Sequence, residues 1–173
     1  MNTSKINHAT STIGFSVPHM MVSTVTGIFK EFTGTVEGNP ADLAKSSVQF
    51  QVSVASIDTD NRDRDIHLCS KDFFDTEAFP FMTFISRSIY WMEQEGMYRM
   101  NGDLTLKQTT KRVMFCVTPI DSENFEFRYE VVARIKRKEF GLTWNQAIEA
   151  GGVMVGETID IQLKISVEMN GSD

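Results

Sequence analysis

The chain has 173 residues, and its hydrophobic content of 41% and charged content of 23% are typical of a soluble globular protein. The length suggests one domain over residues 1–173, with a sizeable core. A net charge of −6 argues against nucleic-acid binding, which calls for a concentrated basic surface. The sequence has no run of 18 apolar residues, and its first residues do not resemble a signal peptide. A cytoplasmic location, with Cys69 and Cys116 as free thiols, is therefore expected.

In chain order, the first strands are predicted by apolar and polar residues that alternate with a period of two. Residues 13–17 form the first such segment, and residues 22–36 form the next. Inside the second segment the apolar residues move from odd to even positions without a break. This change of parity predicts a β-bulge near Lys30 and Glu31.

Six further segments have strand character, and Glu95-Gly96 and residues 108–110 fit hairpin turns between neighbouring strands. The last segment is the clearest, because every odd position from Ile159 to Met169 is apolar and every even position between them is polar. The predicted strands are residues 48–54, 81–91, 98–106, 113–117, 125–135 and 159–169.

Three stretches interrupt the alternation. Residues 41–46 predict a single helical turn. Residues 61–75 are the longest departure, where Asp60 or Asn61 can cap a short helix and Asp72 can start a second turn. Residues 143–152 are predicted to be irregular and precede the last strand.

About eight strands with short connections predict an all-β protein that forms a closed antiparallel barrel. The interior of an eight-stranded barrel can be filled by side chains or can hold one small ligand. The inward positions are apolar nearly everywhere, and the chain contains 13 Phe and 10 Met. A cavity would therefore be dry and suited to a hydrocarbon, whereas a filled core would use the same residues.

Several short motifs occur together in a distinctive order. The segment R-D-I-H-L at residues 64–68 precedes D-F-F-D at residues 72–75 and F-P at residues 79–80. In order and spacing the whole set resembles the YceI-like family, a lipocalin-like group of bacterial proteins, over residues 5–169. The other matching segments are residues 15–20, 27–34, 102–106, 109–111 and 138–142.

This resemblance implies an eight-stranded, antiparallel, extended lipocalin-like barrel with a short helical insertion around residues 61–76. It also implies that the lumen binds a polyisoprenoid or a similar long-chain amphiphile, and that the protein forms a homodimer. Many members carry a periplasmic signal peptide, which the first residues here do not resemble. The sequence also differs at Lys107-Gln108, where Gly is common in second place, and at Glu139, where Asp is usual.

The predicted ligand-binding residues form two groups. In the first, His19, Arg64, Asp65 and His67 match polar positions of the family, and we expect them near the mouth of the barrel, where a few polar groups would orient a ligand. An alternative is that Arg64 and Asp65 pair with neighbouring residues and anchor the loop. The second group is expected to line the lumen and consists of Phe15, Val17, Phe29, Phe50, Phe115, Phe127 and Ile161.

The expected function is to bind and shield a polyisoprenoid, an isoprenoid quinone or a fatty-acid-like lipid, without catalysis, cofactor or metal. Asp63 and His67 lie one helical turn apart and His19 could join them, but no further ligand has a spacing typical of zinc. One alternative is an enzyme that uses His19 or His67 as a base on a lipid-like substrate. Another is a filled barrel that acts through its surface or a dimer interface.

The basic residues cluster once, after the predicted strand at residues 125–135. Four charges at the end of a strand are more often a solvated edge than a binding surface, so we expect these side chains to be exposed. They are Arg134, Lys136, Arg137 and Lys138.

Overall fold

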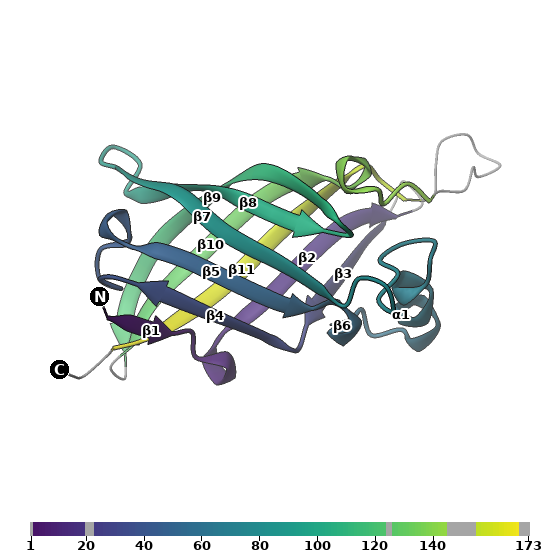
Figure 1. Ribbon diagram of the computed structural model, residues 1–173, viewed down its shortest axis with the longest axis horizontal. Helices are drawn as coiled ribbons and strands as arrows, with labels where there is room; N and C mark the ends of the chain where they lie inside the picture. The colour runs from purple at the N-terminus through teal and green to yellow at the C-terminus, as the bar shows by residue number, and fades with distance from the viewer. Residues whose placement is uncertain (1, 20–22, 124–125, 145–154, 170–173) are drawn as a thin grey trace.

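The computed structural model describes residues 2–19, 23–123, 126–144 and 155–169, in which a single antiparallel sheet curls into a barrel (Figure 1). The strand order is β1-β4-β5-β7-β8-β9-β10-β11-β2-β3-β6. The strands are β1 (Thr3–Lys5), β2 (Thr12–His19), β3 (Ser23–Phe29), β4 (Phe32–Glu37), β5 (Ser47–Ser53), β6 (Ile57–Asp58), β7 (Phe81–Met92), β8 (Met97–Leu106), β9 (Thr109–Glu123), β10 (Glu126–Lys136) and β11 (Thr158–Glu168).

The predicted all-β antiparallel barrel is confirmed, but the number of strands differs in detail. Each of the eight predicted segments contains a strand, and the short strands β1 and β6 were not predicted. Val22 and Phe125, at the ends of two predicted strands, lie outside the described residues. The predicted hairpin turn at Glu95-Gly96 is present. The turn predicted at residues 108–110 lies slightly earlier, at Lys107-Gln108, and Thr109 and Thr110 already belong to β9.

The predicted bulge near Lys30 and Glu31 is wrong, because the chain passes there from one strand to another. β3 pairs with β2 and β6, whereas β4 pairs with β1 and β5. The amide of Lys30 donates to the carbonyl oxygen of Ser56 at 3.2 Å, and the carbonyl oxygen of Glu31 accepts from the amide of Ser53 at 2.9 Å. The change of parity therefore marks a corner of the barrel, on either side of which Phe29 and Phe32 are both buried.

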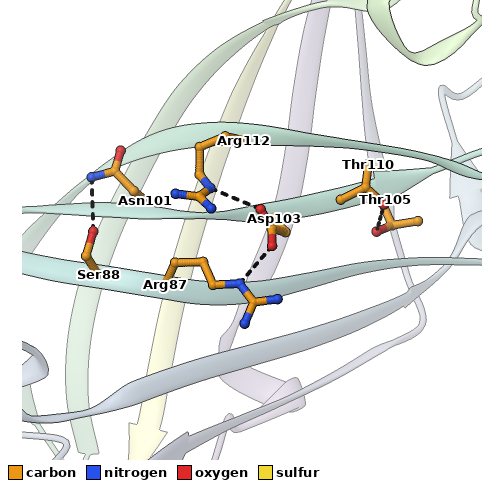
Figure 2. Close-up of polar contacts among 7 residues, drawn as sticks. All are labelled: Arg87, Ser88, Asn101, Asp103, Thr105, Thr110 and Arg112. Atoms are coloured by element: carbon orange, nitrogen blue, oxygen red, sulfur yellow. Dashed lines mark hydrogen bonds and ion pairs between the residues drawn. The ribbon is translucent and has the colours of Figure 1, made fainter.

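The inner and outer faces of the strands alternate as the sequence predicts. On β8, the even positions Tyr98, Met100, Gly102, Leu104 and Leu106 are buried, whereas the odd positions are more exposed. The outer face of β7, β8 and β9 carries polar contacts from strand to strand (Figure 2). At their centre the carboxylate of Asp103 accepts hydrogen bonds from two guanidinium groups, those of Arg87 at 2.7 Å and Arg112 at 3.0 Å.

The two ends of the barrel are covered differently. At one end, which we call the η2 end, the predicted turn in residues 41–46 is present as η2 (Leu43–Lys45), with Leu43 buried. The hydroxyl of Tyr129 donates to the carbonyl oxygen of Pro40 beside it. The opposite end carries the helix α1 (Arg62–Cys69) and the short 3-10 helix η4 (Arg137–Phe140), and we call it the α1 end (Figure 1).

Candidate functional site

The barrel contains a cavity of about 180 Å³ whose wall is almost entirely apolar. Leu43 and Tyr129 line it towards the η2 end, and Leu68 and Phe73 line it towards the α1 end. The inward side chains of the strands form the rest of the wall. The cavity therefore extends along the barrel, and the described residues do not form a completely filled core.

Most of the residues predicted to face the lumen do so. Phe127 does not line the cavity: it is half-buried, packs against the core and lies opposite Val167 on β11. It lies two positions closer to the start of β10 than Tyr129, which already borders the cavity at the η2 end. The predicted residues that do line the cavity are Phe15, Val17, Phe29, Phe50, Phe115 and Ile161.

The helical insertion forms where the sequence predicts it, and it covers one end of the cavity. Asn61 caps α1 by accepting a hydrogen bond from the amide of Arg64 at 3.0 Å, which satisfies a donor that has no partner within the first helical turn. After the helix ends, the chain turns back and directs Phe73 and Phe74 into the cavity wall beside Leu68. These three apolar residues were missed as lumen residues, although D-F-F-D was recognised as a motif.

Arg64 and Asp65 lie side by side on α1 but do not line the cavity. Both contact Thr59, which is 4% exposed. The carboxylate of Asp65 accepts from the Thr59 amide at 3.0 Å and from the Thr59 hydroxyl. The guanidinium of Arg64 donates to the Thr59 hydroxyl oxygen at 2.8 Å and to its carbonyl oxygen at 2.7 Å. These contacts match the alternative in which the pair anchors the loop.

His67 also lies away from the cavity wall. The Nε2 atom of His67 is 2.8 Å from a carboxylate oxygen of Asp72, and its ring meets the rings of Phe73 and Trp144 edge to face. The imidazole is partly exposed, and its contact with the ring of Trp144 connects the insertion to the segment that contains that residue. His19 is the last residue of β2, and its side chain lies outside what the structure describes. The structure therefore does not gather Arg64, Asp65 and His67 around one point of the lumen.

Arg137 was predicted to lie on a solvated edge, and this prediction is wrong. The residue is 2% exposed and borders the cavity. Its guanidinium donates to four carbonyl oxygens, those of Leu142 at 2.6 Å, Trp144 at 2.9 Å, Val155 at 3.2 Å and Gly156 at 2.7 Å. Burial lowers the pKa of the Arg137 guanidinium from its ordinary value, because the cation loses hydration.

The sequence offered one signal for the burial of Arg137. It continues the odd parity of Ile135 on β10, which is the inward parity, whereas Arg134, Lys136 and Lys138 do not. Two of these three exposed residues form ion pairs, Arg134 with Asp160 at 2.7 Å and Lys138 with Glu157 at 3.1 Å. Of the stretch that was predicted to be irregular, residues 143–152, the part from 145 to 152 lies outside the described residues.

The described residues contain no group of three or more His, Cys, Asp or Glu side chains that could hold a metal ion. Cys69 and Cys116 are both free thiols in the structure. Among the helices that the structure describes, none has the length and the apolar composition needed to cross a membrane.

Comparison with known proteins adds independent information. Two staphylococcal UPF0312 proteins are similar over most of their length: one from Staphylococcus epidermidis is 36% identical over 88% of this chain and 89% of its own. One from Staphylococcus aureus USA300 is 34% identical over 95% of both chains.

Solved structures show the same fold. The structure of Burkholderia cenocepacia BcnA has a TM-score of 0.81 and 25% identity and covers 93% of this chain and 98% of its own. A polyisoprenoid-binding domain from Saccharophagus degradans has a TM-score of 0.68 and 14% identity, with 96% and 97% covered. The model of the YceI-like domain matches residues 5–167. Given this match and the relatives that are 34% and 36% identical over most of its length, the chain belongs to the YceI-like family.

Proposed function

We propose that this protein binds a long-chain apolar or amphiphilic lipid, such as a polyisoprenoid, an isoprenoid quinone or a fatty acid, inside its barrel and shields the lipid from water. The observation that carries the proposal is the cavity that extends between the η2 end and the α1 end with an almost wholly apolar wall. Such a wall offers burial to hydrocarbon and few hydrogen bonds to a polar molecule.

The energetics of burial favour a chain-like ligand. Each methylene group removed from water contributes about 0.8 kcal/mol, so a chain of about a dozen carbons gains roughly 10 kcal/mol before the costs of association. Several kcal/mol remain after the ligand and the side chains around it are ordered. No reactive group is needed for such binding, and His67, one of the histidines considered as bases, lies off the cavity wall.

The size of the cavity limits how a long chain can bind. An apolar cavity of about 150 Å³ is large enough for one benzene molecule. At about 180 Å³ the cavity is only slightly larger, so a long chain requires the wall to rearrange. Met82 and Met100 in the wall are flexible side chains that can move at low cost, which supports an adaptable lumen.

The fold relatives support the same class of ligand. The Saccharophagus degradans domain with this fold is described as a polyisoprenoid-binding domain. Its sequence is only 14% identical to this chain, so its ligand is a guide to the chemical class alone.

Mass spectrometry of an organic extract of the purified protein tests the proposal directly. We expect a lipid at a stoichiometry near one per chain, or uptake of an added isoprenoid or fatty acid by the empty protein. An extract without lipid, together with no uptake of either probe by the folded protein, would overturn the proposal.

A substitution in the lumen gives a matched test. Ile161→Trp places a large ring in the cavity wall and should reduce lipid uptake by about tenfold or more, a loss of about 1.4 kcal/mol in binding free energy. Gln162→Trp adds the same side chain to the adjacent exposed position and should leave uptake unchanged. Equal uptake by both folded variants would contradict binding in the lumen.

A further inference from the structure

Three glycines occupy inward positions in the wall of the barrel, and each lies beside a phenylalanine of a neighbouring strand. Gly27 on β3 is the register partner of Phe15 on β2, and Gly34 on β4 is the partner of Phe50 on β5. Gly102 on β8 lies next to the ring of Phe84 on β7. The cavity is lined by all three of these phenylalanines.

The rings occupy the space in which a side chain of the glycine would stand. A β-carbon added to Gly27 would lie 2.5 Å from Cζ and 2.7 Å from Cε1 of Phe15, and 2.8 Å from the methyl carbon Cγ2 of Thr59. One added to Gly34 would lie 3.0 Å from Cε1 of Phe50 and 2.7 Å from Cγ1 of Ile6. Carbon atoms in contact prefer separations of about 3.5–4.0 Å. Each ring can therefore lie across the neighbouring strand only because the residue there has no side chain.

This arrangement leaves the lumen wider, because the phenylalanine rings take up less of it. A phenylalanine ring that lies flat over the neighbouring backbone projects less far into the barrel than a ring that stands away from the sheet. With a methyl group at position 27, the Phe15 ring would have to move by about 1 Å, since normal contact distances must be restored. At position 34, the Phe50 ring would have to move by a few tenths of an ångström, and the side chain of Ile6, which also lines the cavity, would have to move by about 1 Å. The cavity is the free space on that side of the sheet, so the ring would move into it.

We infer that Gly27 and Gly34 are specificity-determining residues, which set the width of the lumen so that it accepts methyl-branched chains as well as straight ones. The inference rests on the proposed lipid-binding function. Gly102 contributes in the same way, but an added β-carbon there also meets the backbone oxygen of Ile85 at 2.5 Å. A substitution of Gly102 would therefore disturb the sheet itself, and positions 27 and 34 are the useful ones to test.

The test compares two probes of equal main-chain length, palmitic acid and the tetramethyl-branched phytanic acid. We expect Gly27→Ala and Gly34→Ala each to weaken phytanic acid binding about tenfold or more and palmitic acid binding much less. Adding Phe15→Leu to Gly27→Ala should restore phytanic acid binding, because the smaller side chain vacates the lumen. Circular dichroism and thermal melting establish that each variant is folded.

Gly14→Ala is the matched control. The backbone of Gly14 borders the cavity, but its added β-carbon would meet its nearest atom at 3.4 Å and would stand on the outer face, which carries its exposed register partners Ile28 and Gln162. It should bind both probes as the unsubstituted protein does. Unchanged phytanic acid binding in folded Gly27→Ala and Gly34→Ala, or an equal loss in Gly14→Ala, would overturn the inference.

A second measurement separates this inference from the proposed function. Xenon enters dry apolar cavities without a polar group, and its uptake can be followed by nuclear magnetic resonance. We expect lower xenon uptake in Gly27→Ala and Gly34→Ala than in Gly14→Ala. If no variant binds either acid, the proposed function fails, while the xenon result still decides whether the glycines set the free volume. Equal xenon uptake in all three variants would contradict the inference.

Discussion

Arg137 is a buried cation that is solvated by main-chain carbonyl oxygens. Its guanidinium connects the carbonyls of Leu142 and Trp144 on one side with those of Val155 and Gly156 on the other. The planar group presents its donors in a fixed fork, which suits several acceptors at once. One side chain thus holds together two chain segments beside the α1 end of the cavity.

Substituting Arg137 should strongly destabilise the protein. Arg137→Met keeps much of the side-chain volume but leaves four carbonyl oxygens without their donor, and each unsatisfied buried group costs about 1–3 kcal/mol. We expect the free energy of unfolding, measured by chemical denaturation, to fall by at least about 3 kcal/mol. Lys136→Met, at the adjacent exposed position, should change it by less than about 0.5 kcal/mol. Similar values for the two variants would show that the carbonyls find other donors.

At the scale of elements, α1 is attached to the barrel through Thr59, which directly follows β6. The attachment depends on the polar residues Arg64 and Asp65, and the apolar residues of the insertion complete the cavity wall. Most residues of α1 are polar, and none of them is fully buried. Its position is therefore determined by these specific contacts and by the segment that follows it.

We expect Asp65→Ala to lower stability with little effect on ligand affinity. The substitution leaves the buried amide of Thr59 without its acceptor, at a cost of about 1–3 kcal/mol in the free energy of unfolding. Asp65 does not line the cavity, so lipid affinity measured well below the melting temperature should change less than about threefold, or 0.7 kcal/mol. Asp63→Ala, exposed on the same helix, is the control. A large loss of affinity with unchanged stability would instead assign Asp65 to the ligand.

The strands β7, β8 and β9 are connected on their outer face by Asp103 and its two arginines (Figure 2). Hydrogen bonds from Arg87 and then from Arg112 lower the pKa of Asp103 below its ordinary value. A carboxyl group with a lower pKa in the folded state stabilises that state above its ordinary pKa. This stabilisation is lost as the pH falls through the lowered value.

Asp103→Asn should therefore change how stability depends on pH. The variant should be less stable than the unsubstituted protein at pH 7, and the difference should shrink as the pH falls below the ordinary pKa of 3.8. The arginines are exposed, so the effect should also decrease at high salt. Denaturation midpoints of both proteins between pH 2 and pH 7 measure how the difference in stability depends on pH. A difference that stays constant with pH would contradict the role assigned to the ion pairs.

At the scale of the whole molecule, the barrel is a curled sheet whose first and last strands in sheet order are very short. β1 and β6 contain only three and two residues, and neither has the alternation that made the longer strands recognisable. Ile6, just after β1, forms a bridge to Val167 on β11 and connects β4 with β11 near the η2 end. Pairing between distant segments creates these strands, so a pattern search within one segment does not detect them.

The corner at Lys30 and Glu31 illustrates the same limit. Its parity change was visible in the sequence, and its position was predicted correctly. A bulge and a transfer between neighbouring strands both shift the apolar residues by one position, so the pattern does not distinguish them. The pairing partners show that the chain transfers between strands here, because β3 and β4 pair with different strands on both sides.

By itself, the sequence determined which segments contain the longer strands, which face of most of these strands is inward, where the helical insertion begins and which family the chain resembles. These are local properties, because alternation and capping depend on residues a few positions apart. Only the tertiary structure decided that the lumen is partly empty, that Arg137 is buried and that Arg64 and Asp65 bind Thr59. Free volume is what remains after side chains of many strands have packed, and it depends on how each ring lies against its neighbours. Phe15 over Gly27 shows why: two ordinary residues of the sequence set the width of a cavity only once the strands that carry them are paired.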